Sequence, residues 1–139
     1  MDGTNNTKEG FGLPSSTLRI IDANLNRLRE GIRVIEDIRR YSFDDKTLAT
    51  SLKTLRHQAR LNNIQELLSA RDIVGDVLKA TTSSEATRES LESVQLANMK
   101  RAQESARVLE EILKISDTAA AETFKHIRYE LYDIEKKLF

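Results

Sequence analysis

Apolar residues recur every three or four positions along most of the chain, which is the spacing that places them on one face of an α-helix. The clearest stripe lies near the C-terminus and consists of Phe124, Ile127, Leu131, Ile134 and Leu138. An earlier stripe consists of Ile21, Leu28, Ile35 and Ile38. The pattern predicts an all-α protein.

Turn and capping residues divide this pattern into four expected helices. A helix begins well where a side-chain oxygen can accept a hydrogen bond from the backbone of the first turn. Such residues precede each expected helix: Ser15–Thr17, Asp44 or Asp45, the capping box Thr82–Glu85, and Ser116–Asp117. The helices are expected over about 16–41, 45–70, 85–115 and 117–139.

The polar residues of the first expected helix are repeated in the third. The segment ANLNRLREGIRVIEDI (23–38) is identical to ANMKRAQESARVLEEI (97–112) at half of its positions. The second and fourth helices also correspond, because Arg56 aligns with Arg128 once two residues are dropped from the connecting turn. The identical polar pairs of the first and third helices are Asn24/Asn98, Arg27/Arg101, Glu30/Glu104, Arg33/Arg107 and Glu36/Glu110.

This repeat predicts a duplicated αα-hairpin. We expect hairpin one (16–70) and hairpin two (85–139) to pack as an antiparallel four-helix bundle with internal pseudo-twofold symmetry. Pairing two copies buries the apolar face that a single hairpin leaves exposed. The hairpins form a single helical domain, 16–139, in which a loop (71–84) joins them. The polar start, 1–15, has no apolar signal region and is expected to be a disordered leader.

The composition agrees with a helical domain and excludes several classes of function. Charged residues make up 32% of the 139 residues, the net charge is zero, and there is only one proline. Without a cluster of like charges or a long apolar run, we expect no nucleic-acid partner and no membrane span. The absence of cysteine excludes disulfides and agrees with a cytoplasmic protein.

The repeated asparagine lies at the centre of each apolar stripe, and the repeated Arg27 and Arg101 lie beside it on the inner side. In one interpretation Asn24 and Asn98 bond to each other across the twofold axis, while Arg27 and Arg101 pair with Glu30 and Glu104. Such pairs would only fix the register of the bundle. In the other, the small residues Gly31 and Ser105 leave room for an anionic ligand beside the amides and guanidiniums.

The remaining repeated charges are expected on the outside. Arg33, Arg107, Glu36 and Glu110 are interpreted as solvated partners three or four residues apart on one helix. Arg56 and Arg128 lie on the rims of their helices, where they could reach a phosphate.

The loop between the hairpins contains a second candidate site. Arg71, Asp72 and Asp76 lie within six residues, around Gly75. Two carboxylates and a guanidinium suit a phosphate bound to Mg²⁺, because hard oxygen ligands hold the ion while arginine binds the anion. The same residues also suit a capped turn that binds nothing.

Other chemistries have no support in the sequence. It contains neither a P-loop nor a G-x-G-x-x-G motif. His57 and His126 lie far apart without a cysteine, and the Glu-x-x-His motif of di-iron bundles is missing.

The two N-x-x-R-x-x-E-x-x-R-V-[IL]-E segments, joined by an R-D…D-V loop, resemble one known family. The segments RIIDANLNRLREGIRVIEDIRRY, LKTLRHQ, ARDIVGDV and LANMKRAQESARVLEEILK occur in the same order as in the all-helical hydroxymethylpyrimidine phosphate kinase of thiamine biosynthesis. In that family the domain often precedes a thiamine-phosphate synthase barrel. The resemblance is close over about 18–115. Two positions depart from it: Leu78 stands where a glycine is expected, and Gln103 replaces the arginine of the first copy.

The resemblance implies ATP-dependent phosphorylation of 4-amino-5-hydroxymethyl-2-methylpyrimidine phosphate to its diphosphate, with Mg²⁺ as cofactor. It agrees with a catalytic group made of Arg71, Asp72 and Asp76, the two aspartates being the Mg²⁺ candidates. The expected substrate- and nucleotide-binding residues are Asn24, Arg27, Glu30, Asn98, Arg101, Glu104 and Arg56. The alternative is a non-catalytic helical module that assembles with a separate thiamine-phosphate synthase. A homodimer also stays open.

Overall fold

The computed structural model describes residues 10–139, and within them all regular secondary structure is helical. The prediction of an all-α protein is therefore confirmed for this part of the chain. Residues 1–9, most of the expected leader, lie outside the described residues. The elements in chain order are α2 (Ser15–Asp37), the π-helix η1 (Ile38–Ser42), α3 (Lys46–Gln58), α4 (Ile64–Ala70), α5 (Ser83–Ala86), α6 (Leu91–Leu113) and α7 (Thr118–Leu138).

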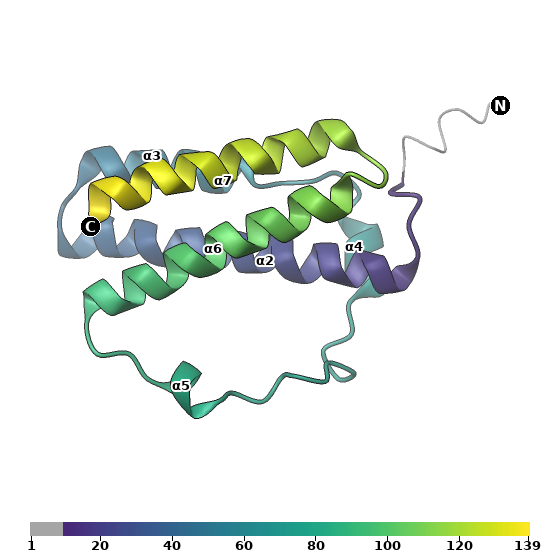
Figure 1. Ribbon diagram of the computed structural model, residues 1–139, viewed down its shortest axis with the longest axis horizontal. Coiled ribbons are helices and arrows are strands. Elements are labelled where there is room, and N and C mark those ends of the chain that lie inside the picture. The colour runs from purple at the N-terminus through teal and green to yellow at the C-terminus, as the bar shows by residue number, and fades with distance from the viewer. Residues whose placement is uncertain (1–9) are drawn as a thin grey trace.

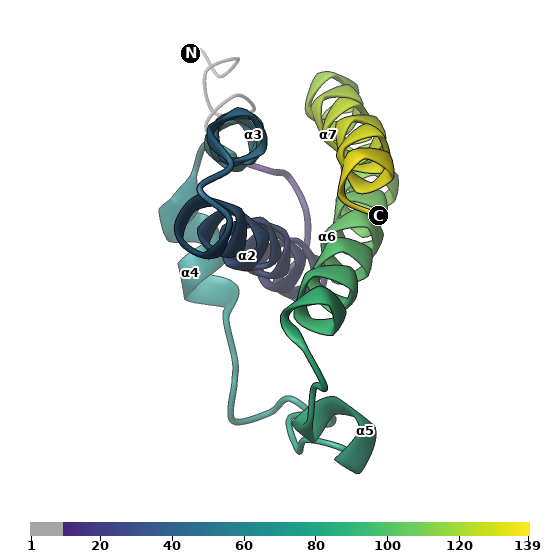
Figure 2. The ribbon, with the colours of Figure 1, turned by 90° about the vertical axis from the view of Figure 1, so that its left-hand side faces the viewer.

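The long helices pack as two pairs. Helix α2 packs against α3, α6 packs against α7, and the most extensive contact joins α2 to α6 (Figure 1). Figure 2 shows α2 and α3 on one side of the molecule and α6 and α7 on the other. The segment that carries α5 leaves the helices on the side of α2 and α6 opposite to α3 and α7. None of the described helices combines the length and the apolar content needed to cross a membrane.

The predicted apolar stripes form the core. Ile21, Leu28 and Ile35 of α2 are fully buried, and so are Ile127 and Leu131 of α7. Burying a side chain of this kind contributes about 1.5–3 kcal/mol relative to leaving it exposed. The contacts among these stripes therefore hold the two helix pairs together.

The expected second helix is interrupted. Helix α3 ends at Gln58, and α4 begins only at Ile64, so the prediction of one helix over 45–70 was wrong. Asn63, at the start of α4, has a φ of 61°, in the left-handed region that asparagine tolerates better than most residues. The adjacent Asn62 and Asn63 are the sequence signal for this break.

Two of the predicted helix starts, at Asp45 and Asp117, have the expected caps. Asp45 accepts a hydrogen bond from the Leu48 amide, and Asp117 accepts one from the Ala120 amide. The capping box of Thr82 and Glu85 is also present, but it opens only the four-residue α5. The long third helix, α6, starts instead after Ser90.

The described end of the expected leader is attached to the helices. Phe11 and Leu13 pack against the core, and the Phe11 amide donates to Glu66 Oε1 at 3.1 Å. Residues 10–14 therefore extend the packed part of the chain beyond the start of α2.

Gly31 lies where α2 and α6 approach each other closely. A Cβ atom at this position would lie 3.1 Å from the carbonyl oxygen of Asn98 and 3.5 Å from Ala102 Cβ. The space beside Gly31 is thus filled by the backbone of α6. The interpretation that Gly31 leaves room for a ligand was wrong, because its small size is used for helix packing.

Candidate functional site

A cavity of about 470 Å³ lies between α2 and the segment that follows α4; we call it the α2 pocket. Three arginines and three aspartates line it together with two asparagines and two isoleucines. Its main lining residues are Arg19, Ile20, Asp22, Asn24, Asn26, Arg27, Arg71, Asp72, Ile73 and Asp76. The cavity therefore contains the whole predicted loop cluster and two of the repeated residues.

A second cavity, of about 490 Å³, lies between α6 and the later part of the same segment; we call it the α6 pocket. Four cationic side chains and two carboxylates line it. Its main lining residues are Leu78, Lys79, Thr81, Glu85, Arg88, Asn98, Lys100, Arg101 and Glu104. It contains three of the predicted binding residues.

The two pockets are lined by equivalent positions of the sequence repeat. Ala23, Asn24 and Arg27 line the α2 pocket, and their counterparts Ala97, Asn98 and Arg101 line the α6 pocket. The linings of the two pockets are also close in sequence, because Asp76 lines the α2 pocket and Leu78 lines the α6 pocket. Two residues of extended chain span at most about 7 Å, so the two cavities come close together at this point.

Each repeated asparagine bonds to its own helix. Asn24 Nδ2 donates to the Ile20 carbonyl at 2.9 Å, and Asn98 Nδ2 donates to the Val94 carbonyl at 2.9 Å. The expected bond between the two asparagines does not form, so that interpretation was wrong. Asn24 is 7% exposed, although no residue of another element holds its amide among the described hydrogen bonds.

The repeated arginines beside them face solvent. Arg27 and Arg101 are both exposed, which corrects the prediction of an inward position. An arginine at the margin of an apolar stripe can extend its long side chain to water. Among the described residues, neither Glu30 nor Glu104 forms an ion pair with these guanidiniums; Glu30 is exposed outside both pockets, and Glu104 lines the α6 pocket.

Arg71 is held by a residue that the sequence analysis did not single out. Its Nε and Nη2 atoms donate to the two carboxylate oxygens of Asp22 at 2.7 and 2.8 Å. This hydrogen bonding raises the pKa of Arg71 above its ordinary value. Asp22 is 7% exposed, and its counterpart in the second copy is Leu96. The aspartate therefore fixes the start of the connecting segment over the α2 pocket, and only the first copy has it.

The two loop aspartates cap turns of their own segment. Asp72 Oδ1 accepts the Gly75 amide at 2.8 Å, and Asp76 Oδ1 accepts the Leu78 amide at 3.0 Å. Arg19 Nη2 donates to the Asp72 carbonyl at 3.3 Å, which ties the same turn to α2. The predicted capped turn is thus present, and among the described hydrogen bonds the second carboxylate oxygen of each aspartate accepts none.

The most buried repeated charge is the glutamate. Glu36 is 2% and Glu110 is 4% exposed, so the prediction that both are solvated was wrong. Arg56 Nε donates to Glu36 Oε1 at 2.8 Å, and Arg128 Nη2 donates to Glu110 Oε1 at 2.9 Å. Hydrogen bonding to Glu36 raises the pKa of Arg56. Arg56, which we predicted to bind phosphate, therefore lies in an ion pair outside both pockets.

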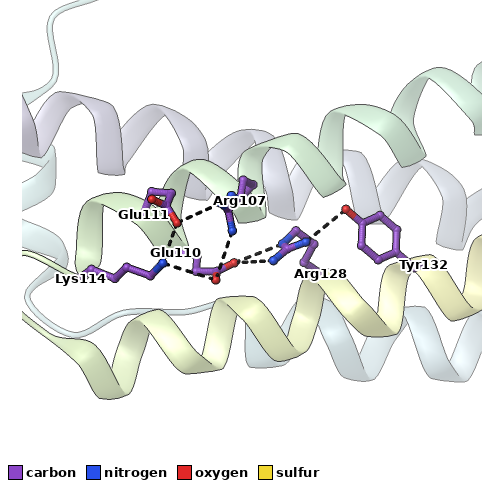
Figure 3. Close-up of polar contacts among 6 residues, drawn as sticks. All are labelled: Arg107, Glu110, Glu111, Lys114, Arg128 and Tyr132. Atoms are coloured by element: carbon purple, nitrogen blue, oxygen red, sulfur yellow. Dashed lines mark hydrogen bonds and ion pairs between the residues drawn. The ribbon is translucent and has the colours of Figure 1, made fainter.

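The Glu110 pair is part of a larger network in the second hairpin (Figure 3). Arg128 Nη1 also contacts the Tyr132 hydroxyl at 3.3 Å. Arg107 and Lys114 approach Glu110 from its other side, with nitrogen–oxygen distances of 3.5 and 4.0 Å. Arg33 and Arg107 are exposed, as predicted.

A comparison with known families identifies the family of the chain. The model of the ThiD2 family matches residues 19–137, and the chain belongs to this family. The chain is also similar to proteins named thiamine-phosphate synthase. Identity is 38% over 126 residues with the one from Synechocystis sp., 40% over 121 with that of Nostoc punctiforme, and 41% over 121 with that of Thermosynechococcus vestitus.

These alignments cover 90%, 86% and 86% of the chain, but only 37%, 34% and 34% of the relatives. The chain thus spans about a third of the length of the curated relatives it matches. Together with the family, they support a domain of thiamine biosynthesis. No solved structure matches the chain significantly.

Proposed function

We propose that this chain is a kinase of thiamine biosynthesis. It transfers the γ-phosphoryl group of ATP to 4-amino-5-hydroxymethyl-2-methylpyrimidine phosphate and forms the diphosphate and ADP. The observation that carries the proposal is the pair of cavities, lined by equivalent residues of the repeat, that come close together at Asp76 and Leu78. A reaction between two phosphorylated ligands needs two such pockets with a shared border.

The reaction forms one bond and breaks one. A phosphate oxygen of the pyrimidine monophosphate bonds to the γ-phosphorus, and the bond from that phosphorus to the β–γ bridging oxygen breaks. The bridging oxygen leaves as part of the terminal phosphate of ADP. Catalysis of this kind depends on positioning and on neutralising phosphate charge. The exposed guanidiniums of Arg27 in the α2 pocket and Arg101 in the α6 pocket can supply positive charge that neutralises the phosphates.

Magnesium fits this site as an ion shared with the substrates. The described residues contain no cluster of three or more histidines, cysteines or carboxylates that could hold a metal alone. Mg²⁺ in kinases is usually bound by one or two carboxylates together with substrate phosphates. The free carboxylate oxygens of Asp72 and Asp76 fit that role, and the ion would neutralise charge on the phosphates.

The test is an assay with Mg-ATP and the pyrimidine monophosphate, in which ADP and the diphosphate are both measured. We expect equal amounts of the two products. Production of neither, with the monophosphate or with the unphosphorylated alcohol as acceptor, would rule out the kinase.

The second candidate is a non-catalytic module that assembles with a thiamine-phosphate synthase. The relatives named above favour it, and so does a group of exposed apolar side chains on the connecting segment. Ile73, Val74, Val77 and Leu78 are 73%, 81%, 92% and 85% exposed. Under this proposal, the double substitution Val74→Asp and Val77→Asp abolishes co-elution of the chain with a thiamine-phosphate synthase. Co-elution that survives the substitutions would exclude this surface.

A further inference from the structure

The two pockets differ in charge, and on this basis we infer which ligand each one takes. We propose that the α6 pocket binds the triphosphate of the nucleotide and that the α2 pocket binds the pyrimidine monophosphate. This assignment rests on the proposed kinase function. The cavities are similar in volume, about 490 and 470 Å³, so size does not distinguish them.

The α6 pocket has an excess of positive charge. Its four cations, Lys79, Arg88, Lys100 and Arg101, face two carboxylates, Glu85 and Glu104. Among the described residues, no carboxylate forms an ion pair with Lys79 or Arg101. A polyphosphate is attracted to such a cavity because unpaired cations give up no existing partner when they bind it.

The Glu85 carboxylate is engaged within its own segment. Thr82 donates to Glu85 Oε1 from its backbone at 3.0 Å and from its hydroxyl at 2.9 Å. These hydrogen bonds, with smaller effects of Arg101 and Arg88, hold the pKa of Glu85 below its ordinary value. Glu85 therefore serves the capping of α5, and among the described hydrogen bonds Arg88 donates only to backbone carbonyls. Both nearby arginines can reorient toward a phosphate.

Lys100 is already engaged. Its Nζ atom lies 2.8 Å from Glu135 Oε2, and Gln103 Nε2 donates to Oε1 of the same residue at 2.8 Å. The cations available to a ligand in the α6 pocket are therefore Lys79, Arg88 and Arg101.

The α2 pocket has no such excess. Its three arginines are matched by three aspartates, and Arg71 is fully engaged by Asp22. Among the described residues two of its guanidiniums form no ion pair, Arg27 and Arg19, and Arg19 donates to the Asp72 carbonyl. The carboxylates of Asp72 and Asp76 line the same cavity and offset their charge, which suits a single phosphate. Two amides, Asn24 and Asn26, and two apolar side chains, Ile20 and Ile73, suit the edge and the face of a heterocycle.

The test measures binding of inorganic tripolyphosphate with Mg²⁺ by titration calorimetry, which needs no turnover. Arg101→Gln is compared with its repeat counterpart Arg27→Gln, and Lys136→Gln is a control for the loss of one exposed charge away from both pockets. Loss of one charge-assisted contact corresponds to about a tenfold weaker affinity. We expect that loss in Arg101→Gln and in Lys79→Gln, and less than about a threefold change in the other two variants.

Three results would overturn the assignment: a larger loss of affinity in Arg27→Gln than in Arg101→Gln, an equal loss in both, or no binding of millimolar tripolyphosphate to the unmodified protein. The kinase assay is independent of this result. If products form but the expected difference in affinity is absent, the kinase function is supported and the assignment of the pockets is wrong. If the difference is found but no products form, the α6 pocket binds a triphosphate and the kinase function is wrong.

Discussion

Arg56 and Glu36, on α3 and α2, form a doubly hydrogen-bonded ion pair, with nitrogen–oxygen distances of 2.8 and 3.3 Å. The same pairing joins Arg128 of α7 to Glu110 of α6. Each pair links the two long helices of one hairpin, and each glutamate is almost fully buried. The repeated R-V-[IL]-E sequence thus places a buried acceptor for an arginine of the neighbouring helix.

The first prediction concerns these ion pairs. Arg56→Ala leaves the Glu36 carboxylate buried without its partner, so we expect the free energy of unfolding to fall by about 3 kcal/mol. Arg33→Ala removes an exposed pair with Asp37 on the same helix, and its effect should stay below about 1 kcal/mol. Urea unfolding of both variants gives the comparison. Equal effects would show that burial does not strengthen the interaction.

The second prediction concerns the contact of α2 with α6. Gly31→Ala gains about 1 kcal/mol of helix propensity, but its Cβ atom would press on the Asn98 carbonyl oxygen. Because that oxygen belongs to a helix backbone, we expect crowding of about 1–3 kcal/mol to exceed the gain. Glu30→Ala, at the neighbouring exposed position, is the control for introducing alanine into α2 without crowding against α6. A variant more stable than the unmodified protein in a thermal melt would contradict the close packing.

The third prediction concerns the repeated asparagines. Asn24→Leu removes only a bond to Ile20 within the same helix, so the substitution should leave the free energy of unfolding unchanged or raise it. Turnover should be lost, because the amide is expected to bind substrate. Asn98→Leu should behave in the same way in the α6 pocket. A urea melt beside a kinase assay tests both, and variants that are destabilised but active would remove the asparagines from the site.

The fourth prediction separates two roles of Asp76. Asp76→Asn keeps the Oδ1 atom that accepts the Leu78 amide, so the turn and the free energy of unfolding should be preserved. The loss of charge should abolish turnover, with partial rescue at raised Mg²⁺ concentration. Asp133→Asn, on the exposed side of α7, serves as the control. Unchanged turnover would leave Asp76 with a structural role only.

The fifth prediction concerns pH. The Leu48 amide and then the Arg39 side chain hold the pKa of Asp45 below its ordinary value of about 3.9. A lowered folded-state pKa means that this stabilisation is fully present above about pH 4 and is lost as the pH falls through the folded-state value. Asp45→Asn keeps the cap but loses the charge. We expect its deficit in free energy of unfolding at pH 7 to shrink steadily below about pH 4; a deficit that stayed constant would contradict the role of the charge.

Periodicity predicted the buried stripes and the starts at Asp45 and Asp117, because each depends on residues close together in sequence. Periodicity wrongly predicted that Glu36 and Glu110 are solvated, because a helical wheel shows one helix without the helices that pack against it. Each glutamate lies at the margin of its wheel and is buried by an arginine of the next helix. The sequence did contain a signal for these ion pairs: Arg56 aligns with Arg128, so the arginine partner of each glutamate is repeated together with the glutamate.

Most of the residues predicted for the site line one of the two pockets, but Arg56 and Glu30 lie outside both, and the sequence did not predict the division into two pockets. Asn24 and Asp76 come together only because the connecting segment turns back to α2 after α4. The anchor for that turn is the bond from Arg71 to Asp22, across 49 positions of the chain. Asp22 is a single acidic residue outside the repeat, so neither spacing nor repetition distinguishes it.

The presence of Asp22 in only one copy makes the walls of the two pockets unequal. One end of the connecting segment is bound to α2 by a buried carboxylate, so the wall of the α2 pocket is preformed. The other end, at Arg88, bonds only to carbonyls of its own segment. With two identical copies, either substrate could occupy either half, and mismatched complexes would form that lead to no product. For the proposed kinase, this single aspartate makes the two halves unequal, because only the α2 pocket has a wall that a buried carboxylate fixes without any ligand.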